Sequence, residues 1–301
     1  MQVFKFQNNT ANIPSSVVTI GNFDGIHLGH RALISAAVQE AKTRGYTSAL
    51  VTFDPHPQEI IHSQQSVPRI CTSSHQLRLL EEIGLDEVHV IPFTKELAQL
   101  GPEEFAFQFL IQRFDLKKLV IGYDFRFGKH RAGDFKLLEI LSQKYNFSLE
   151  EVAPVQERSQ TVSSTLIRQL IRKYRFAEIP HYLGRDYSVY GQVEQGEQRG
   201  KNLGFPTANI LPGVTLALPE GVYVSKIKLA GKTHYGVTNV GKRPTFGENS
   251  VTVETFIFDL EKVIYGEYLE VIPLSQLRPE MKFSSVEELK TQIRQDIETA
   301  R

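Results

Sequence analysis

Two hydrophobic patterns divide the chain. From Val17 to about Val155, short apolar runs alternate with stretches in which apolar residues recur at helical spacing. The runs predict strands at 17–20, 49–53, 88–91 and 118–121, and the amphipathic stretches predict helices at 28–41, 75–83 and 102–114. Apolar strands joined by helices are typical of a parallel sheet covered on both faces. We therefore predict a doubly wound α/β domain whose ligands bind beyond the carboxyl ends of the strands.

After about Phe176, helical periodicity gives way to short β-prone runs punctuated by Gly, Pro and Thr. The runs lie at 187–193, 222–229, 235–240, 251–258 and 268–272. They predict a small antiparallel β-barrel or sandwich. The boundary is expected between Arg172 and Asp186, which gives a first domain of residues 1–178 and a second domain of residues 179–301.

A C-terminal helix is predicted to close the second domain. Ser284 and Glu287 have the spacing of a capping box, in which hydroxyl and carboxylate groups satisfy free backbone N–H groups. The apolar stripe of this helix comprises Val286, Leu289, Ile293 and Ile297.

Composition narrows the class of protein. The 301 residues are 41% hydrophobic and 23% charged, and 34 basic against 34 acidic residues give a net charge of zero. No general attraction to nucleic acid or anionic lipid follows from this balance. Cys71 is the single cysteine, which excludes an intrachain disulfide and fits a reducing compartment. Without a signal peptide or an apolar run of about 18 residues, we expect a cytoplasmic protein with neither a membrane nor a nucleic-acid partner.

The first candidate site is the segment from Gly21 to His30, which leads from the first predicted strand into the first predicted helix. Glycines permit a tight turn, and a helix N-terminus offers unpaired N–H groups and partial positive charge. His27 and His30 are three residues apart, so both can donate hydrogen bonds to one polyphosphate. Two other interpretations stay open at this point, namely a capped helix with two surface histidines and a two-histidine metal site.

Two common nucleotide motifs are excluded. The triplet Gly231–Thr233 resembles the end of a P-loop, but Lys226 occupies the place of the required glycine and the segment reads as a hairpin. No G-x-G-x-x-G sequence opens the α/β domain, which removes the best support for a dinucleotide-dependent dehydrogenase.

Three further segments follow predicted strands or begin a helix. Thr52–Pro57 carries prolines that restrict a turn, and Gly122–Asp134 combines aromatic, basic and glycine residues suited to a ring and a phosphate. Ser163–Arg168 offers hydroxyls and a cation at a predicted helix start, where a simple N-cap is the alternative.

Four segments together resemble the adenylyltransferase half of the bifunctional bacterial riboflavin kinase/FAD synthetase family. Their sequences are G-N-F-D-G-I-H-L-G-H, T-F-D-P-H-P, D-F-R-F-G-K-x-R-x-G-D and S-S-T-x-I-R. In the second half, G-F-P-T-A-N at 204–209 resembles the riboflavin kinase signature. Further residues follow this signature in the order that the family shows, namely the segment 239–246, Glu254, Tyr265–Gly266 and Leu277–Glu280. The resemblance covers nearly the whole chain.

The resemblance implies that the second domain transfers the γ-phosphoryl group of ATP to riboflavin and gives FMN. Thr207 and Asn209 are implied to hold Mg²⁺, an assignment that suits hard oxygen ligands. Glu254 is implied to be the base that accepts the proton of the flavin hydroxyl. Further implied ligand-binding residues of this domain are Gly204, Pro206, Asn239 and Arg278.

The resemblance implies that the first domain joins AMP from a second ATP to FMN, giving FAD and pyrophosphate. His27, His30 and Arg168 are the implied catalytic residues, which stabilise charge on the polyphosphate. Further implied nucleotide- or flavin-binding residues are Gly21, Phe23, Asp24, Gly29, Asp124, Ser163, Ser164 and Thr165.

One departure concerns the adenylyltransferase half. Leu166 stands where the family commonly has a basic residue, so a kinase with a weak or non-catalytic nucleotide-binding domain is an alternative. A flavin-responsive RNA-binding regulator, with bases stacked on the loop at 125–131, is a second alternative that the zero net charge disfavours.

Overall fold

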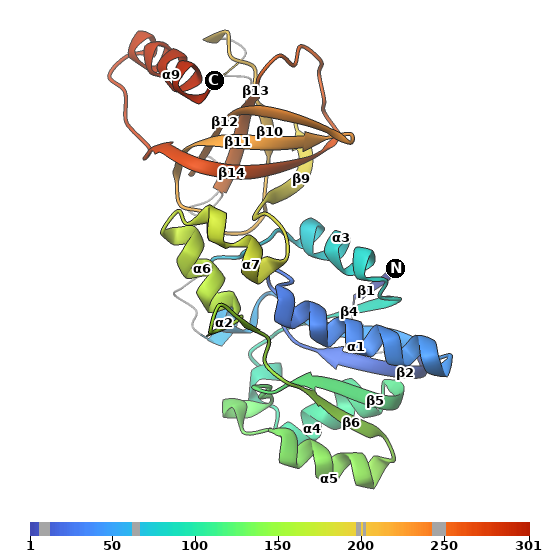
Figure 1. Ribbon diagram of the computed structural model, residues 1–301. Coiled ribbons are helices and arrows are strands. Elements are labelled where there is room, and N and C mark those ends of the chain that lie inside the picture. The colour runs from blue at the N-terminus through green and yellow to red at the C-terminus, as the bar shows by residue number, and fades with distance from the viewer. Residues whose placement is uncertain (6–12, 62–66, 197–199, 201–202, 243–250) are drawn as a thin grey trace. The chain divides into compact units, whose positions relative to one another are not determined.

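A computed structural model describes residues 1–5, 13–61, 67–196, 200, 203–242 and 251–301 (Figure 1). The chain divides into two compact units. The N-terminal unit comprises Met1–Val67 and Leu77–Val162, and the barrel unit comprises Pro68–Gln76 and Ser163–Arg301. The predicted domain boundary after residue 178 stays a prediction. Residues 201–202 and 243–246 of the quoted motifs lie outside the described residues.

The N-terminal unit is built on a six-stranded sheet in the order β1-β4-β3-β2-β5-β6. Every neighbouring pair is parallel, which confirms the predicted sheet. Its strands are β1 (Gln2–Lys5), β2 (Ile13–Ile20), β3 (Thr47–Asp54), β4 (Glu87–Pro92), β5 (Phe114–Gly122) and β6 (Ser148–Val152). A separate small hairpin pairs β7 (Gln156–Glu157) with β8 (Gln160–Thr161).

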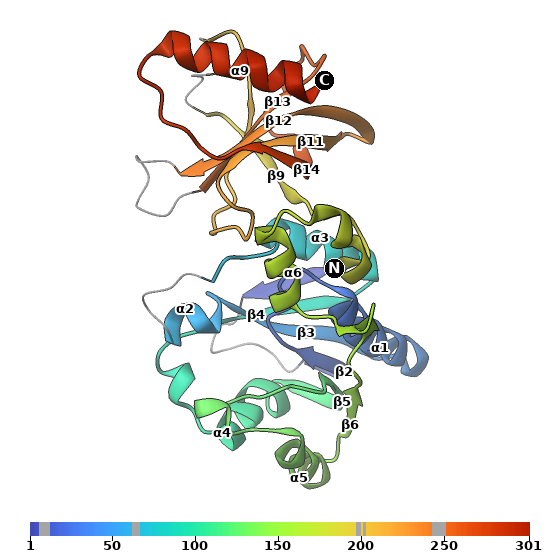
Figure 2. The same cartoon turned by 60° about the vertical axis from the view of Figure 1, so that its left-hand side comes forward.

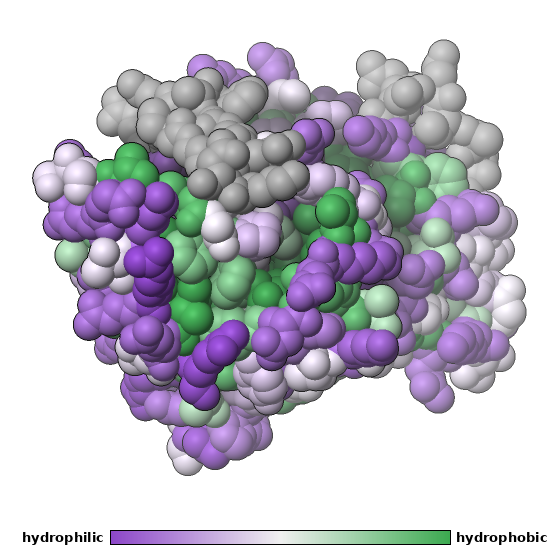
Figure 3. Space-filling model, turned by 90° about the horizontal axis from the view of Figure 1, so that it is seen from above, coloured by the Kyte–Doolittle hydropathy of each residue, from purple (hydrophilic) through white to green (hydrophobic). Residues whose placement is uncertain are grey.

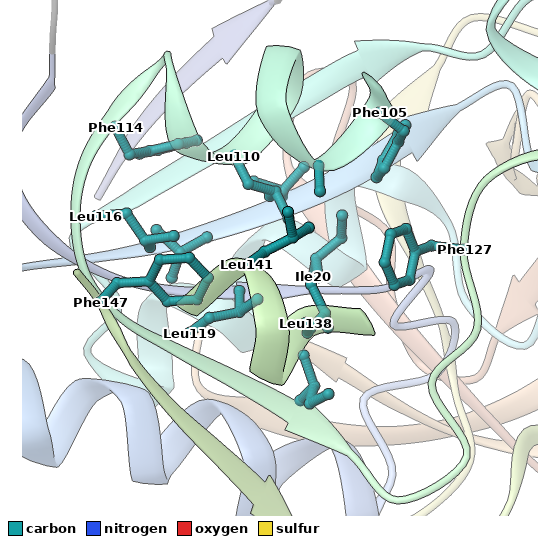
Figure 4. Close-up of a cluster of buried hydrophobic side chains, with 14 of the residues drawn as sticks. Ile20, Phe105, Leu110, Phe114, Leu116, Leu119, Phe127, Leu138, Leu141 and Phe147 are labelled. Atoms are coloured by element: carbon teal, nitrogen blue, oxygen red, sulfur yellow. The ribbon is translucent and has the colours of Figure 1, made fainter. Parts of the chain in front are cut away.

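Helices cover both faces of this sheet. They are α1 (Leu28–Arg44), α2 (Pro57–Ile61), α3 (Ser73–Ile83), η1 (Leu97–Gln99), α4 (Pro102–Ala106), η2 (Phe107–Ile111), η3 (Lys129–Arg131) and α5 (Phe135–Tyr145). Adjacent β2 residues point to opposite faces, since Val17 packs in a core with α1 and Val18 packs in a second core with α4 and α5. Figure 4 shows this second core, in which Phe105, Leu110 and Leu138 meet.

The sequence pattern located the helices better than their boundaries. The predicted helix 102–114 is α4 followed by the π-helix η2, and Phe114 already belongs to β5. Helix α1 ends at Gly45, whose φ of 69° is the left-handed conformation that glycine adopts without strain. β1, β6 and α5 were not predicted.

The barrel unit, seen in Figure 2, contains a closed six-stranded barrel. Its strand order is β10-β13-β12-β11-β14-β9, and β9 is also paired to β10. Because the sheet closes on itself, the second domain is the predicted barrel and not the alternative sandwich. Its strands are β9 (Val189–Glu194), β10 (Ala208–Ile210), β11 (Gly221–Leu229), β12 (Lys232–Lys242), β13 (Val251–Ile257) and β14 (Tyr268–Arg278). The P-loop look-alike is a hairpin, because the positive φ angles of Ala230 and Gly231 form the two-residue turn between β11 and β12.

Helices α6 (Ser164–Arg172), η4 (Phe176–Glu178), α7 (Pro180–Leu183) and α9 (Val286–Ala300) complete the barrel unit. The predicted cap of α9 is wrong by one residue. The Oγ of Ser285 accepts from the backbone N–H of Glu288, and the Glu288 carboxylate accepts two hydrogen bonds from Ser284. Val286 at the start of the predicted apolar stripe is 57% exposed.

The surface is mixed in polarity. On the face in Figure 3, hydrophilic side chains surround smaller hydrophobic areas, in keeping with equal numbers of acidic and basic residues. Within the described ranges, every helix is too short or too polar to cross a membrane.

Candidate active sites

The sheet order places a topological switch point between β2 and β5. From β2 the chain passes to β3 on one side, whereas β5 pairs with the other side of β2. Loops that leave two such strands diverge at their carboxyl ends and open a crevice for a ligand. The segments Gly21–His27 and Gly122–Asp134 leave β2 and β5 at this edge, so the topology brings together two of the predicted site segments.

Buried side chains fix the loop after β2. Phe23 and Ile26 have φ angles of 50° and 41°, and their side chains are almost completely buried. The strain of a positive φ at such residues is offset by this apolar packing. A Cβ on Gly21 would lie 3.2 Å from the Phe23 ring, and Asp24 is buried at the same turn. The predicted residues Gly21, Phe23 and Asp24 therefore shape the loop.

The two histidines form a stacked pair at the start of α1. His27 is the N-cap, and its Nδ1 accepts a hydrogen bond of 3.2 Å from the backbone N–H of His30. The two rings stack with centroids 3.5 Å apart and planes inclined by 17°, while the Phe23 ring meets His30 edge-on. A Cβ on Gly29 would lie 3.2 Å from the His27 ring, so glycine leaves room for the stack.

This pair has the chemistry of an anion site. Imidazole N–H groups and the N-terminus of a helix both stabilise negative charge. A metal centre has less support, because the described residues contain no group of three or more His, Cys, Asp or Glu side chains arranged to hold an ion.

The loop after β5 combines exposed and tethered groups. Asp124 is exposed and Tyr123 is 47% exposed, and burial of the rest of the ring, with Asp124 nearby, raises the pKa of Tyr123. Arg126 forms an ion pair of 3.1 Å with Asp134, which also caps α5 by accepting from Leu137. The hydrogen bond from the Leu137 N–H and the Arg126 charge both lower the pKa of Asp134. The Arg126 guanidinium is therefore paired with Asp134, a carboxylate that also caps α5.

Helix α6 carries the other predicted residues of the adenylyltransferase site, and it belongs to the barrel unit. The Oγ of Ser163 accepts a hydrogen bond of 3.2 Å from Leu166, which is the N-cap arrangement. Ser164 is half-buried and Thr165 is exposed in the first turn. Arg168 donates from Nε to the backbone oxygen of Pro68 at 2.8 Å. Joint action of these residues and the histidine pair on one ATP stays a prediction.

In the barrel, three predicted residues fall into one row across neighbouring strands. Glu254 of β13 pairs with Asn209 of β10 on one side and with Asn239 of β12 on the other. Directly opposite residues of antiparallel strands share a face of the sheet. Thr238 and Thr255, adjacent in sequence to this row, are buried and their hydroxyls lie 3.1 Å apart. Since side chains alternate along a strand, the row lies on the outer face of the barrel.

Two glycines lie close against the Asn209 end of this row, where a side chain would not fit. A Cβ on Gly196 would lie 2.7 Å from the Asn209 amide, and one on Gly200 would lie 3.2 Å from the Thr207 hydroxyl. Asn209 donates from Nδ2 to the Thr207 backbone oxygen at 3.2 Å, which leaves its Oδ1 as an acceptor. Hydroxyl and amide oxygens suit Mg²⁺, which completes its shell with phosphate oxygens and water. The residues present therefore fit the implied cation.

The remaining predicted residues have different surroundings. Gly204 has a φ of 90°, which explains glycine in the turn before the exposed Pro206. Arg278 forms a bidentate ion pair with Asp296 of α9, at 3.0 Å from Nε to Oδ1 and 2.9 Å from Nη2 to Oδ2. Its predicted place near a flavin stays a prediction.

Asp296 was missed in the sequence. The sequence feature that could have indicated it is a carboxylate on the apolar face of a helix. Asp296 is three residues after Ile293 and next to Ile297, so all three lie on one side of the helix. Gly196 was also missed, since only the pairing of β9 with β10 brings it to Asn209.

A switch-point crevice with paired imidazoles and a barrel with an Asn–Glu–Asn row define a two-site, nucleotide-using transferase. A family model described as FAD synthetase matches residues 9–166, and one described as riboflavin kinase matches residues 183–301. The chain belongs to the bifunctional riboflavin kinase/FMN adenylyltransferase family.

Full-length relatives agree with both matches. A bifunctional riboflavin kinase/FMN adenylyltransferase of Buchnera aphidicola is 36% identical and is aligned over 99% of this chain and 96% of its own. The protein of that name from Escherichia coli K12 is 34% identical over 100% of this chain and 97% of its own. A crystal structure described as a macrolide-efflux protein from Streptococcus pneumoniae is similar with a TM-score of 0.73 and 29% identity, covering 99% of this chain and 98% of that one.

Proposed function

We propose that this chain makes FAD from riboflavin in two ATP-dependent steps. The riboflavin kinase half, residues 183–301, phosphorylates riboflavin to FMN, and the FAD synthetase half, residues 9–166, adenylylates FMN to FAD and releases pyrophosphate. The observation that carries the proposal is the outer-face row in which Glu254 lies between Asn209 and Asn239. A carboxylate between two amides can accept a proton while neutral groups on both sides orient the reactants.

In the kinase step, Glu254 accepts the proton of the ribityl 5′-hydroxyl as its oxygen attacks the γ-phosphorus of ATP, and ADP leaves. An alcohol is a weak nucleophile until its proton is taken, so one positioned base accounts for this requirement. Thr207 and Asn209 would hold Mg²⁺ and the nucleotide phosphates through their hydroxyl and amide oxygens. A bound cation would supply positive charge beside the transferring phosphoryl group.

In the adenylyl step, a phosphate oxygen of FMN attacks the α-phosphorus of ATP, and pyrophosphate leaves. The phosphate is already an anion near neutral pH, so this step needs alignment and charge stabilisation rather than a base. His27 and His30 contact the ATP phosphates at the start of α1, with Gly29 leaving room for their stack. Hydrogen-bond donors for the ATP phosphates come from Ser163, Ser164, Thr165 and Arg168. Asp124 lies near the flavin or adenine ring.

The other predicted site residues hold the loops that form the two sites. Gly21, Phe23 and Asp24 hold the loop before the histidines, and Gly204 and Pro206 hold the turn before Thr207. ATP use in both steps and the buried thiol of Cys71 favour the cytoplasm as the site of action.

One assay tests the proposed function. The pure chain is incubated with riboflavin, ATP and Mg²⁺, and flavins are separated by chromatography over time. FMN is expected first and FAD later, and a chain that yields neither product refutes the proposal. A parallel reaction starts from FMN and measures pyrophosphate. Release of pyrophosphate distinguishes the bifunctional enzyme from a kinase whose N-terminal half is weakened by Leu166.

A further inference from the structure

Helix α9 buries a charged residue more deeply than the residues of its apolar stripe. Asp296 is the buried residue of α9, with a side chain only 7% exposed, whereas Leu289, Ile293 and Ile297 are half-buried. A buried carboxylate is costly unless it is paired and hydrogen-bonded. The position of α9 therefore depends on the group that Asp296 meets.

That group is the guanidinium of Arg278, the last residue of β14. Nε and Nη2 donate to the Asp296 carboxylate, and Nη1 donates to the backbone oxygen of Pro279 at 3.2 Å. Gln292 adds a hydrogen bond of 2.9 Å to Asp296, and the guanidinium lies over the ring of Phe283. This bidentate geometry fixes orientation as well as distance.

The pair lies at one end of the row that contains the proposed base. Arg278 is paired with Val222 of β11, which is paired with Asn239, which is in turn paired with Glu254. Three strand spacings separate β13 from β14 by this path, or roughly 14 Å along the barrel wall. Helix α9 also packs next to β12, the strand that carries Asn239.

Two substrates must meet at Glu254 from different directions. Thr207 and Asn209 occupy the β10 side of the base, so the nucleotide takes that side. The β12–β11–β14 side, next to α9, is left for the flavin, whose ribityl chain and tricyclic ring are long enough to follow the row.

We propose that Asp296 is a positioning residue for riboflavin in the kinase reaction. Through Arg278 it fixes α9 beside the acceptor half of the row, and the pairing leaves neither buried charge uncompensated there. This inference rests on the proposed function of the barrel.

The test separates riboflavin binding from nucleotide binding in the full chain. For Asp296→Asn, we expect the KM for riboflavin to rise about tenfold, because a small displacement of a positioning element is costly, while the KM for ATP changes by less than about twofold. Asp296→Glu restores part of the loss. Adenylylation of added FMN stays at the wild-type rate. Glu298→Gln, an exposed carboxylate of the same helix, is the matched control.

Two variants connect the effect to the pair. Arg278→Gln combined with Asp296→Asn is expected to be no worse than either single change, because the two residues act as a unit. Gln292→Leu removes one hydrogen bond and leaves the ion pair, so it raises the riboflavin KM by about threefold. This milder variant keeps the inference testable if Asp296→Asn does not fold.

The outcomes are distinct. A lower melting temperature with an unchanged riboflavin KM in Asp296→Asn and Gln292→Leu overturns the inference and makes the pair a structural clip. Equal rises in both KM values overturn it as well. Absence of FMN from the wild-type reaction refutes the proposed function instead, before any variant is compared.

Discussion

The imidazole of His27 lies flat on that of His30, with ring centroids 3.5 Å apart, and its Nδ1 accepts the backbone N–H of His30. One side chain thus caps α1 and also orients its neighbour. Because the loop before α1 is held by buried Phe23 and Ile26, the backbone that carries the pair has a fixed conformation.

His30→Ala is expected to lower the rate of FMN adenylylation by about 10²–10³-fold, the loss seen when one preorganised donor to a developing anion is removed. FMN formation from riboflavin is expected to stay near the wild-type rate. Chromatography of reactions started from riboflavin or from FMN measures both steps. A parallel loss of both activities contradicts separate sites.

Glu254→Gln is expected to impair FMN formation and to leave FMN adenylylation unchanged. The amide keeps the size of the side chain but does not accept the proton, so FMN formation falls by about 10²–10⁴-fold while conversion of added FMN to FAD continues. Glu261→Gln is the control, since Glu261 is exposed and follows β13 outside the row. Retention of kinase activity in Glu254→Gln would remove Glu254 as the base.

Gly29→Ala tests the histidine stack without removing a functional group. The added Cβ would lie 3.2 Å from the His27 ring, so the ring has to move by a few tenths of an ångström. We expect adenylylation to fall by about tenfold, because small misplacements of catalytic groups are costly. Gly101→Ala is the matched control, with nothing within 4 Å of its Cβ, and it is expected to be neutral. Equal rates for the two variants would argue against the stack as a functional unit.

His89 is expected to make the N-terminal unit sensitive to acid. Burial lowers the pKa of this histidine from its ordinary value of 6.5, although hydrogen-bonded Glu87 opposes the shift and Arg113 adds to it. The ring is stacked on Phe4 and 2% exposed. The unfolded chain therefore binds a proton more readily, so stability is full above pH 6.5 and is lost as the pH falls from 6.5 towards the folded pKa.

Urea unfolding at pH 7.5 and 5.5 measures this loss, which is at most about 1.4 kcal/mol over this interval because only about one pH unit of it lies below 6.5. His89→Gln keeps a donor for Glu87 but has no charge to gain, and it is expected to show a smaller difference between the two pH values. His234→Gln in β12 of the barrel is the control. A pH dependence unchanged by His89→Gln would assign the acid sensitivity to other groups.

Leu166→Arg is expected to speed adenylylation by about threefold, the size of one solvent-exposed charge interaction, here between the added cation and the bound polyphosphate. Leu166 is half-buried in the first turn of α6, where its backbone N–H donates to Ser163. Gln169→Arg adds the same charge on the exposed surface one turn later and serves as the control. An equal gain from both variants would reflect net charge rather than position 166.

The sequence alone determined the fold class of each half and the family to which the chain belongs. Consecutive apolar strands joined by amphipathic helices specify a parallel sheet because such strands are buried on both faces, and the loop after β2 follows from that prediction. Elements with weak hydrophobic signals, such as β1 at the sheet edge and the three-residue β10, were not found.

Only the tertiary structure decided which distant residues lie side by side. Barrel closure and strand register place Asn209, Glu254 and Asn239 in one row, and no local pattern encodes a register between strands far apart in sequence. Likewise Asp296 looked like a polar interruption of a helix until the fold brought Arg278 against it. Periodicity records which side of an element is buried, whereas the partner that a buried polar group meets is set by long-range packing.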